Sequence, residues 1–211
     1  MDRLDAQGRR IGSTRHGVYA FFDYEQEPIY VGQTKESLRQ RIGRHLTNQR
    51  TDAVAMNVLD PFEVAFIEVW PLPELAAADK ETASRKLNSA EYTVFQAVLQ
   101  ASALGAVLNE KDIAPTDIIG LPQSYRGQIV PEPIYERRKH PDIRIARRAS
   151  TIARLAQVIS ERDVSLGLRR TLITQARRLE KLAADRFAQF EASGARVEVE
   201  VGGEETGESA E

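Results

Sequence analysis

Two short tyrosine-bearing segments near the start of the chain constrain its fold more than any other feature. Gly-Val-Tyr occupies residues 17–19 and Tyr-Val-Gly occupies residues 30–32, with ten residues between them. Aromatic and β-branched residues favour strands, and the polar stretch at 23–28 is typical of a turn. The sequence therefore predicts two strands, over residues 16–23 and 28–32, at the spacing of a β-hairpin.

The hydrophobic period changes after the second tyrosine segment. From Ser37 onward, apolar and basic residues recur at three- and four-residue steps, which predicts a helix with Thr34 as a candidate cap. The residues that share one face of this helix are Leu38, Arg41, Ile42, His45 and Leu46. Residues 62–70 alternate imperfectly and predict a third strand, which Pro71 and Pro73 end.

A long helix is predicted from about residue 76 to residue 103, where Ala, Leu and charged residues dominate. In its later half Glu91 falls on the same stripe as Leu87 and Val94. A carboxylate inside an apolar stripe is costly unless it has a partner. The pattern therefore predicts either a functional role for Glu91 or an ion pair with a buried arginine.

The second half of the chain has a different composition. Residues 112–142 contain five prolines and are predicted to be a linker. Two helical patterns follow, over residues 143–160 and 165–190. From residue 193 the chain is rich in Gly and Glu, which is typical of disorder. The predicted divisions are 1–111, 112–142, 143–192 and 193–211.

The net charge of −2 hides a strong asymmetry along the chain. Residues 135–186 carry 14 Lys and Arg against 6 Asp and Glu, whereas residues 187–211 carry one Arg against seven Glu. A basic block of this density can bind phosphate backbones, and charge alone favours a solvated helical surface equally well. The acidic tail could fold back over the basic helices and restrain binding.

The absence of cysteine excludes disulfides, thiolate metal sites and a cysteine nucleophile, and it is typical of a reducing cytoplasm. The chain contains no run of 18 apolar residues, so no membrane span is predicted. The N-terminus lacks the apolar core of a signal peptide. We therefore expect a cytoplasmic protein with no membrane segment.

Together, the two tyrosine segments, Leu38-x-x-Arg41, His45, Glu91 and Asn109 resemble the GIY-YIG nuclease family over roughly residues 16–111. The resemblance implies an α+β fold: a small three-stranded antiparallel sheet flanked by helices, here followed by a mostly helical C-terminal region and a disordered acidic tail. The order strand, strand, helix, strand, helix read from periodicity agrees with this fold.

The resemblance also implies roles for individual residues. Tyr19 and Tyr30 match the two motif tyrosines, Arg41 the arginine that grips the scissile phosphate, and Glu91 the ligand of one Mg²⁺ or Mn²⁺ ion. His45 matches a position that carries histidine or tyrosine in some branches. Tyr19 is the first candidate for the general base, because it is the residue that the resemblance implies. His45 is the second candidate, because a histidine titrates nearer neutrality. The candidate substrate-binding residues are Gly32, Lys35, Asn109, Arg147 and Arg148.

Each of these residues also has a purely structural interpretation. The tyrosines suit a strand core, His45 suits a structural histidine, and Asn109 suits a helix cap. Many relatives carry a lysine directly after the second motif, whereas this chain carries Gln33.

The function predicted first is a divalent-metal-dependent endonuclease that hydrolyses DNA phosphodiester bonds, of restriction, repair or mobile-element type. The alternative is a catalytically inactive nuclease-like domain that binds nucleic acid or a partner. A third interpretation makes the C-terminal helices the seam of a homodimer.

Overall fold

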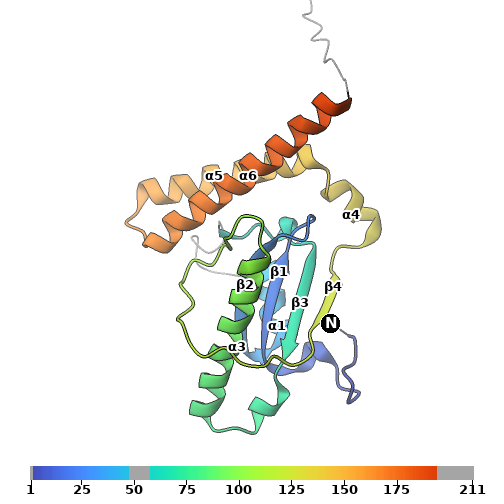
Figure 1. Cartoon of the computed structure of the whole chain (residues 1–211), viewed down its shortest axis with the longest axis vertical. Coiled ribbons are helices and arrows are strands. Elements are labelled where there is room, and N and C mark those ends of the chain that lie inside the picture. The colour runs from blue at the N-terminus through green and yellow to red at the C-terminus, as the bar shows by residue number, and fades with distance from the viewer. Residues whose placement is uncertain (1, 48–57, 194–211) are drawn as a thin grey trace, which may run out of the picture.

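A central antiparallel sheet with helices around it forms the part of the chain that the computed structural model describes, residues 2–47 and 58–193 (Figure 1). The predicted α+β class is therefore confirmed. The strand order is β2-β1-β3-β4, so β2 and β4 are the edge strands. Within the described residues none of the helices is both long and apolar enough to cross a membrane.

The two tyrosine segments form the predicted hairpin. β1 spans Arg15–Phe22 and β2 spans Pro28–Ser37, and they pair antiparallel with Tyr19 opposite Gly32. β2 continues five residues beyond its predicted end at Gly32. Its partner β1 is long enough to pair with the extension as far as Ser37. The second motif thus lies in the middle of an edge strand.

The sheet has four strands, and the prediction of three was wrong. β3, Phe66–Pro71, pairs with β1, and β4, Tyr125–Gln128, pairs with β3. β4 comes from the segment that was predicted to be a linker. Its four residues have no apolar alternation, so only pairing with the free edge of β3 makes them a strand.

Helix α1, Leu38–Leu46, begins directly where β2 ends. Its cap is Ser37, whose side chain accepts a hydrogen bond from the backbone N–H of Gln40. The candidate cap Thr34 lies inside β2 instead. Because α1 follows the strand without a loop, Arg41 and His45 are held at a fixed position relative to the sheet.

Two helices cover opposite faces of the sheet (Figure 1). Tyr19 and Phe21 of β1 pack into one apolar cluster together with Leu38 and Ile42 of α1. Alternate side chains of β1, beginning with Val18, pack into a second cluster beneath α3, Lys80–Ala101. The side-chain alternation of β1 therefore separates the tyrosine face from the face covered by α3.

Three helices form the C-terminal region: α4, Glu132–Arg138, α5, Pro141–Glu161, and α6, Leu166–Ser193. The last two match the predicted helical region and form a hairpin that lies across one end of the sheet (Figure 1). The predicted linker contains both β4 and α4. Most of the predicted disordered tail, residues 194–211, lies outside the described residues.

Buried charges attach this helical hairpin to the sheet. Arg144, Arg148 and Arg178 all contact Asp23 Oδ2, at 3.3, 3.0 and 2.6 Å. Arg144 and Arg148 also contact Glu63 Oε2, at 3.2 and 3.0 Å. All five side chains are nearly inaccessible to solvent. We call them the docking cluster. An ion pair of this kind is expensive to break, because removing one member leaves the others buried and charged.

Candidate active site

The hydroxyl of Tyr19 is the centre of a short hydrogen-bonded chain. It lies 2.8 Å from Nε2 of His45 and accepts a hydrogen bond from Nε of Arg41 at 3.3 Å. Tyr19 is fully buried and His45 is 5% exposed. The Arg41 Nε–H donates to the phenol oxygen, so the single phenol proton is available for Nε2 of His45. A neutral imidazole whose Nε2 carries no hydrogen can accept that proton from Tyr19.

Gly32 makes room for the Tyr19 hydroxyl. A Cβ at position 32 would stand 2.6 Å from that hydroxyl oxygen and 2.8 Å from the ring of Tyr30. The rings of Tyr19 and Tyr30 stack with their centroids 6.2 Å apart. The second tyrosine segment therefore positions Tyr19 of the first: Gly32 leaves space for the phenol of Tyr19, and Tyr30 packs against its ring.

The charges around Arg41 and Glu91 influence one another across the sheet edge. Burial opposes the charged form of Arg41, but Tyr19, with Tyr30 and Glu36, outweighs burial and raises the pKa of the guanidinium. Burial raises the pKa of Glu91, and a hydrogen bond from Gln33 and the charge of Arg41 offset part of that rise. Tyr19, Arg41 and His45 are thus in direct contact, and Glu91 lies within the electrostatic range of Arg41.

Glu91 is held by Gln33, which reaches from β2 to α3. Gln33 Nε2 donates to Oε2 of Glu91 at 2.8 Å. Glu91 makes no ion pair with any of the described residues, so the alternative of a buried arginine partner does not apply to it. A half-buried carboxylate with no cationic partner suits a hard divalent cation such as Mg²⁺, which prefers oxygen ligands and keeps several waters. Within residues 2–47 and 58–193 no group of three acidic or histidine side chains offers a fuller metal site.

Two predicted substrate-binding residues have structural contacts. Lys35 extends along β2 on the same side as Gln33 and donates to Ser84 Oγ at 3.1 Å. Asn109 binds the free edge of β2: its side chain accepts from the backbone N–H of Val31 at 3.1 Å and donates to the carbonyl of Val31 at 2.7 Å. Asn109 thus replaces a neighbouring strand for one residue of the second motif. The substrate roles of both residues stay predictions.

Arg147 and Arg148 do not join the residues around Tyr19. Both lie on α5, where Arg148 belongs to the docking cluster and Arg147 pairs with Glu63 and with Asp60 at 3.7 Å. These ion pairs oppose the phosphate contacts predicted for the two arginines.

Two parts of this arrangement were not predicted from the sequence: the contacts of Gln33 and the docking cluster. Gln33 stands out in the sequence only as a departure from the usual lysine, although its place between the second motif and Glu91 is an available signal. The docking cluster has no such signal, because Asp23 and Arg148 stand 125 residues apart.

A family model matches the part of the chain that carries these residues. Residues 15–93 match the family model described as the GIY-YIG catalytic domain. The match includes Tyr19, Tyr30, Arg41 and Glu91, and it ends before Asn109. Neither the curated proteins nor the solved structures gave a match. The resemblance predicted from the tyrosine segments is thereby confirmed over residues 15–93, which are similar to the GIY-YIG catalytic domain.

Proposed function

We propose that this protein is a divalent-metal-dependent endonuclease that hydrolyses DNA phosphodiester bonds. The observation that carries the proposal is the position of the Tyr19 hydroxyl, between the guanidinium of Arg41 and Nε2 of His45. The family match supports nuclease chemistry, and this contact supplies a phenol with a neighbouring cation and a neighbouring proton acceptor.

Tyr19 is the candidate general base. An unperturbed phenol with a pKa near 10 is only about 0.1% ionised at pH 7, so it needs help to take a proton from water. The charge of Arg41 favours the phenolate electrostatically. His45 is placed to receive the phenol proton through the 2.8 Å contact. Both Tyr19 and His45 then take part in the proton transfer. The phenol oxygen accepts a proton from water, and the imidazole accepts the phenol proton.

Arg41 and Glu91 act on the phosphate side of the reaction. Arg41 would grip the scissile phosphate, because its planar fork can make two hydrogen bonds to a phosphate group. Glu91 would hold the Mg²⁺ or Mn²⁺ ion. When bound, such an ion stabilises negative charge on the phosphate and on the leaving oxygen.

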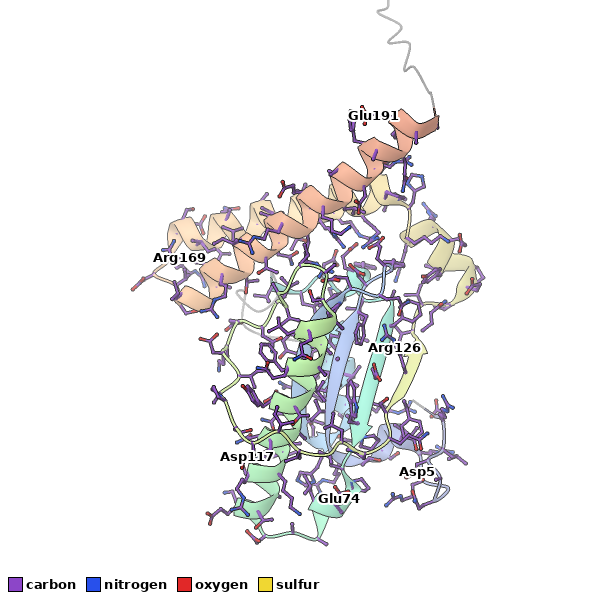
Figure 2. The ribbon with its side chains drawn as sticks, viewed as in Figure 1. Asp5, Glu74, Asp117, Arg126, Arg169 and Glu191 are labelled. Atoms are coloured by element: carbon purple, nitrogen blue, oxygen red, sulfur yellow. The ribbon has the colours of Figure 1, made fainter. Side chains whose placement is uncertain are left out.

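The helical hairpin offers a second set of basic residues for the DNA backbone. The arginines of the docking cluster are buried, but four other arginines are exposed and make no ion pair within the described residues. They are Arg154, Arg162, Arg169 and Arg177. Arg169 lies near the turn between α5 and α6, far from Glu191 (Figure 2). Phosphate contacts of this kind give affinity without sequence preference.

Plasmid cleavage in Mg²⁺ and in Mn²⁺ tests the proposal. The wild-type protein should nick or cut the plasmid, and Glu91→Ala and Arg41→Ala should each abolish cleavage. Glu81→Ala is the matched control, because Glu81 is an exposed carboxylate on the same helix as Glu91. Cleavage that persists in both Glu91→Ala and Arg41→Ala would contradict the assignment of this site as a metal-dependent endonuclease site.

A nuclease-like domain that binds nucleic acid without cutting it is the second candidate. The complete burial of Tyr19 and the near-complete burial of His45 favour it, because a water molecule must reach the phenol for catalysis. Salt-dependent DNA binding with no cleavage, across several substrates and both metals, would select this candidate over the first.

The predicted homodimer through the C-terminal helices stays a prediction. Leu166, Ile173 and Phe187 of α6 are 73%, 54% and 64% exposed and stand at multiples of seven residues, so they share one helix face. Sedimentation of the wild-type chain and of the Ile173→Glu, Phe187→Glu double variant measures whether this face joins two copies.

A further inference from the structure

Gln33 joins the second tyrosine motif to the acidic residue of α3. It follows Gly32 directly and lies opposite Val18 in the sheet. Its side-chain amide donates one hydrogen bond to Oδ1 of Asn88 and one to Oε2 of Glu91, both at 2.8 Å. Both amide hydrogens are therefore used, and both fix the side chain against the same stretch of α3.

The carbonyl end of the same amide has no partner. Oε1 of Gln33 is buried and accepts no hydrogen bond from any of the described residues. A buried acceptor left without a partner destabilises the folded state, because it has lost its hydrogen bonds to water. Rotating the amide by half a turn does not relieve the cost, because the carbonyl oxygen would then face the carboxylate of Glu91. The contact with Glu91 thus fixes an orphan acceptor close to the acidic group.

We propose that Gln33 is a positioning residue for the divalent cation that Glu91 would hold, an inference that rests on the proposed function. Its N–H group fixes the carboxylate of Glu91, and its Oε1 would accept a hydrogen bond from a water bound to the cation. A cation held by one carboxylate keeps most of its waters, and those waters are hydrogen-bond donors. The unpartnered oxygen of Gln33 would be one such acceptor.

The chemistry of an amide explains why it serves here. A lysine at this position would bring three donors, no acceptor and a positive charge. Its ammonium group would pair with Glu91 and would supply no acceptor to the waters of the cation. Gln33 holds Glu91 without neutralising it, so the negative charge remains available to the metal.

Mn²⁺ binding, followed by electron paramagnetic resonance without DNA, tests the proposal apart from catalysis. Gln33→Met keeps the length of the side chain and removes the donor and the acceptor. Because residues that orient a metal ligand typically change affinity 10- to 100-fold, Gln33→Met should raise the Mn²⁺ dissociation constant by about that factor. Gln33→Lys should raise it further. Gln100→Met, at an exposed position near the end of α3, is the matched control and should bind as the wild type does.

A second readout separates positioning from a general structural effect. In plasmid cleavage, Gln33→Met should raise the Mg²⁺ concentration for half-maximal rate by the same factor as the Mn²⁺ dissociation constant, with little change in the rate at saturating Mg²⁺. A residue that only supports the fold would lower the saturating rate or the melting temperature and leave the metal affinity unchanged.

The outcomes for the inference and for the proposed function are distinct. If the wild type binds Mn²⁺ and Glu91→Ala does not, but both Gln33 variants bind within about twofold of the wild type, the role of Gln33 is wrong and the function stands. If the wild type binds no Mn²⁺ at all, the metal-dependent function itself is wrong. Should Gln33→Met fail to fold, Gln33→Lys carries the test, because its ammonium group can replace the contact with Glu91.

Discussion

A Cβ atom at position 32 would stand 2.6 Å from the hydroxyl oxygen of Tyr19. Any side chain there must displace either the phenol or the β2 backbone. Gly32→Ala should therefore destabilise the fold by about 1–3 kcal/mol, the usual cost of overpacking, and abolish cleavage because Tyr19 leaves its place beside His45. Chemical denaturation and plasmid cleavage measure the two effects.

Gly43→Ala is the control for that change. Nothing lies within 4 Å of a Cβ at position 43 in α1, so the alanine should raise stability by about 0.5–1 kcal/mol through helix propensity. Activity that persists in Gly32→Ala would contradict the assigned role of the Tyr19 hydroxyl.

Removing the phenol oxygen alone should separate catalysis from folding. Tyr19→Phe keeps the ring among Phe21 and Tyr30 but deletes the hydrogen bonds with Arg41 and His45. The cleavage rate at saturating metal should fall by about 10²–10⁴-fold, the range for loss of a general base. Mn²⁺ affinity should stay constant, because Glu91 is untouched. Tyr92→Phe on α3 should cleave like the wild type; equal rates for both variants would exclude Tyr19 as the base.

Acid should weaken the docking cluster through Glu63. Burial alone would raise the pKa of this carboxyl, but Arg148, Arg144 and Arg147 together outweigh burial and hold the pKa below its ordinary value of 4.5. Ionised Glu63 therefore contributes stability above pH 4.5, and this contribution is lost as the pH falls further through the folded-state pKa. The pKa of Asp23 shifts in the opposite direction, because burial raises it. The titration of Asp23 therefore does not cause a loss of stability in acid.

Melting temperatures between pH 7 and pH 3.5 check the effect of Glu63. Glu63→Gln should lower stability at pH 7 by about 3–5 kcal/mol, as expected when a buried ion pair loses one member, and should flatten the fall below pH 4.5. The exposed control Glu81→Gln should keep the wild-type profile. A wild-type curve with no fall below pH 4.5 would count against the ionised Glu63.

The two sets of arginines on the hairpin should respond differently to alanine. Arg148→Ala should destabilise the fold, because Arg148 Nε contacts Glu63 and its Nη2 contacts Asp23. Arg169→Ala with Arg177→Ala should leave the melting temperature unchanged and weaken DNA binding. The slope of log affinity against log salt should become shallower by about 0.9 for each phosphate that the variant no longer neutralises. An unchanged slope would show that these two arginines do not contact the DNA backbone.

Asn109 should contribute stability to the second motif rather than chemistry. Asn109→Ala removes both hydrogen bonds to the Val31 backbone at the edge of β2. We expect a loss of about 1–3 kcal/mol in unfolding free energy, with Mn²⁺ affinity unchanged. Asn88→Ala is the contrasting variant on α3, because Asn88 contacts Gln33 instead of the strand edge. A loss of cleavage in Asn109→Ala without a loss of stability would point to a substrate role instead.

Local patterns made the first half of the fold predictable. The hairpin of β1 and β2 and the helix after it follow from aromatic strands, a polar turn and a change of period within about thirty residues. The family resemblance named Tyr19, Arg41, His45 and Glu91, and the structure joins the first three by hydrogen bonds. Each of these features depends on residues that are close together in the chain, or on residues that a family motif identifies.

Features set by distant contacts were not predictable. β4 has no strand pattern of its own and depends on the free edge of β3. Arg147 and Arg148 stand off the apolar stripe of their helix, so periodicity places them in solvent. The burial of Arg148 depends on Asp23 and Glu63, two carboxylates whose position opposite α5 only the folded chain establishes.

The docking cluster also limits where this protein can be shortened. A fragment that stops at residue 140 keeps Asp23 and Glu63 but loses all three guanidinium groups that cover them. Such a fragment would present two bare negative charges and the uncovered end of its sheet to solvent. Anyone who wants the catalytic half as a stand-alone reagent should neutralise both acids with Asp23→Asn and Glu63→Gln before cutting the chain.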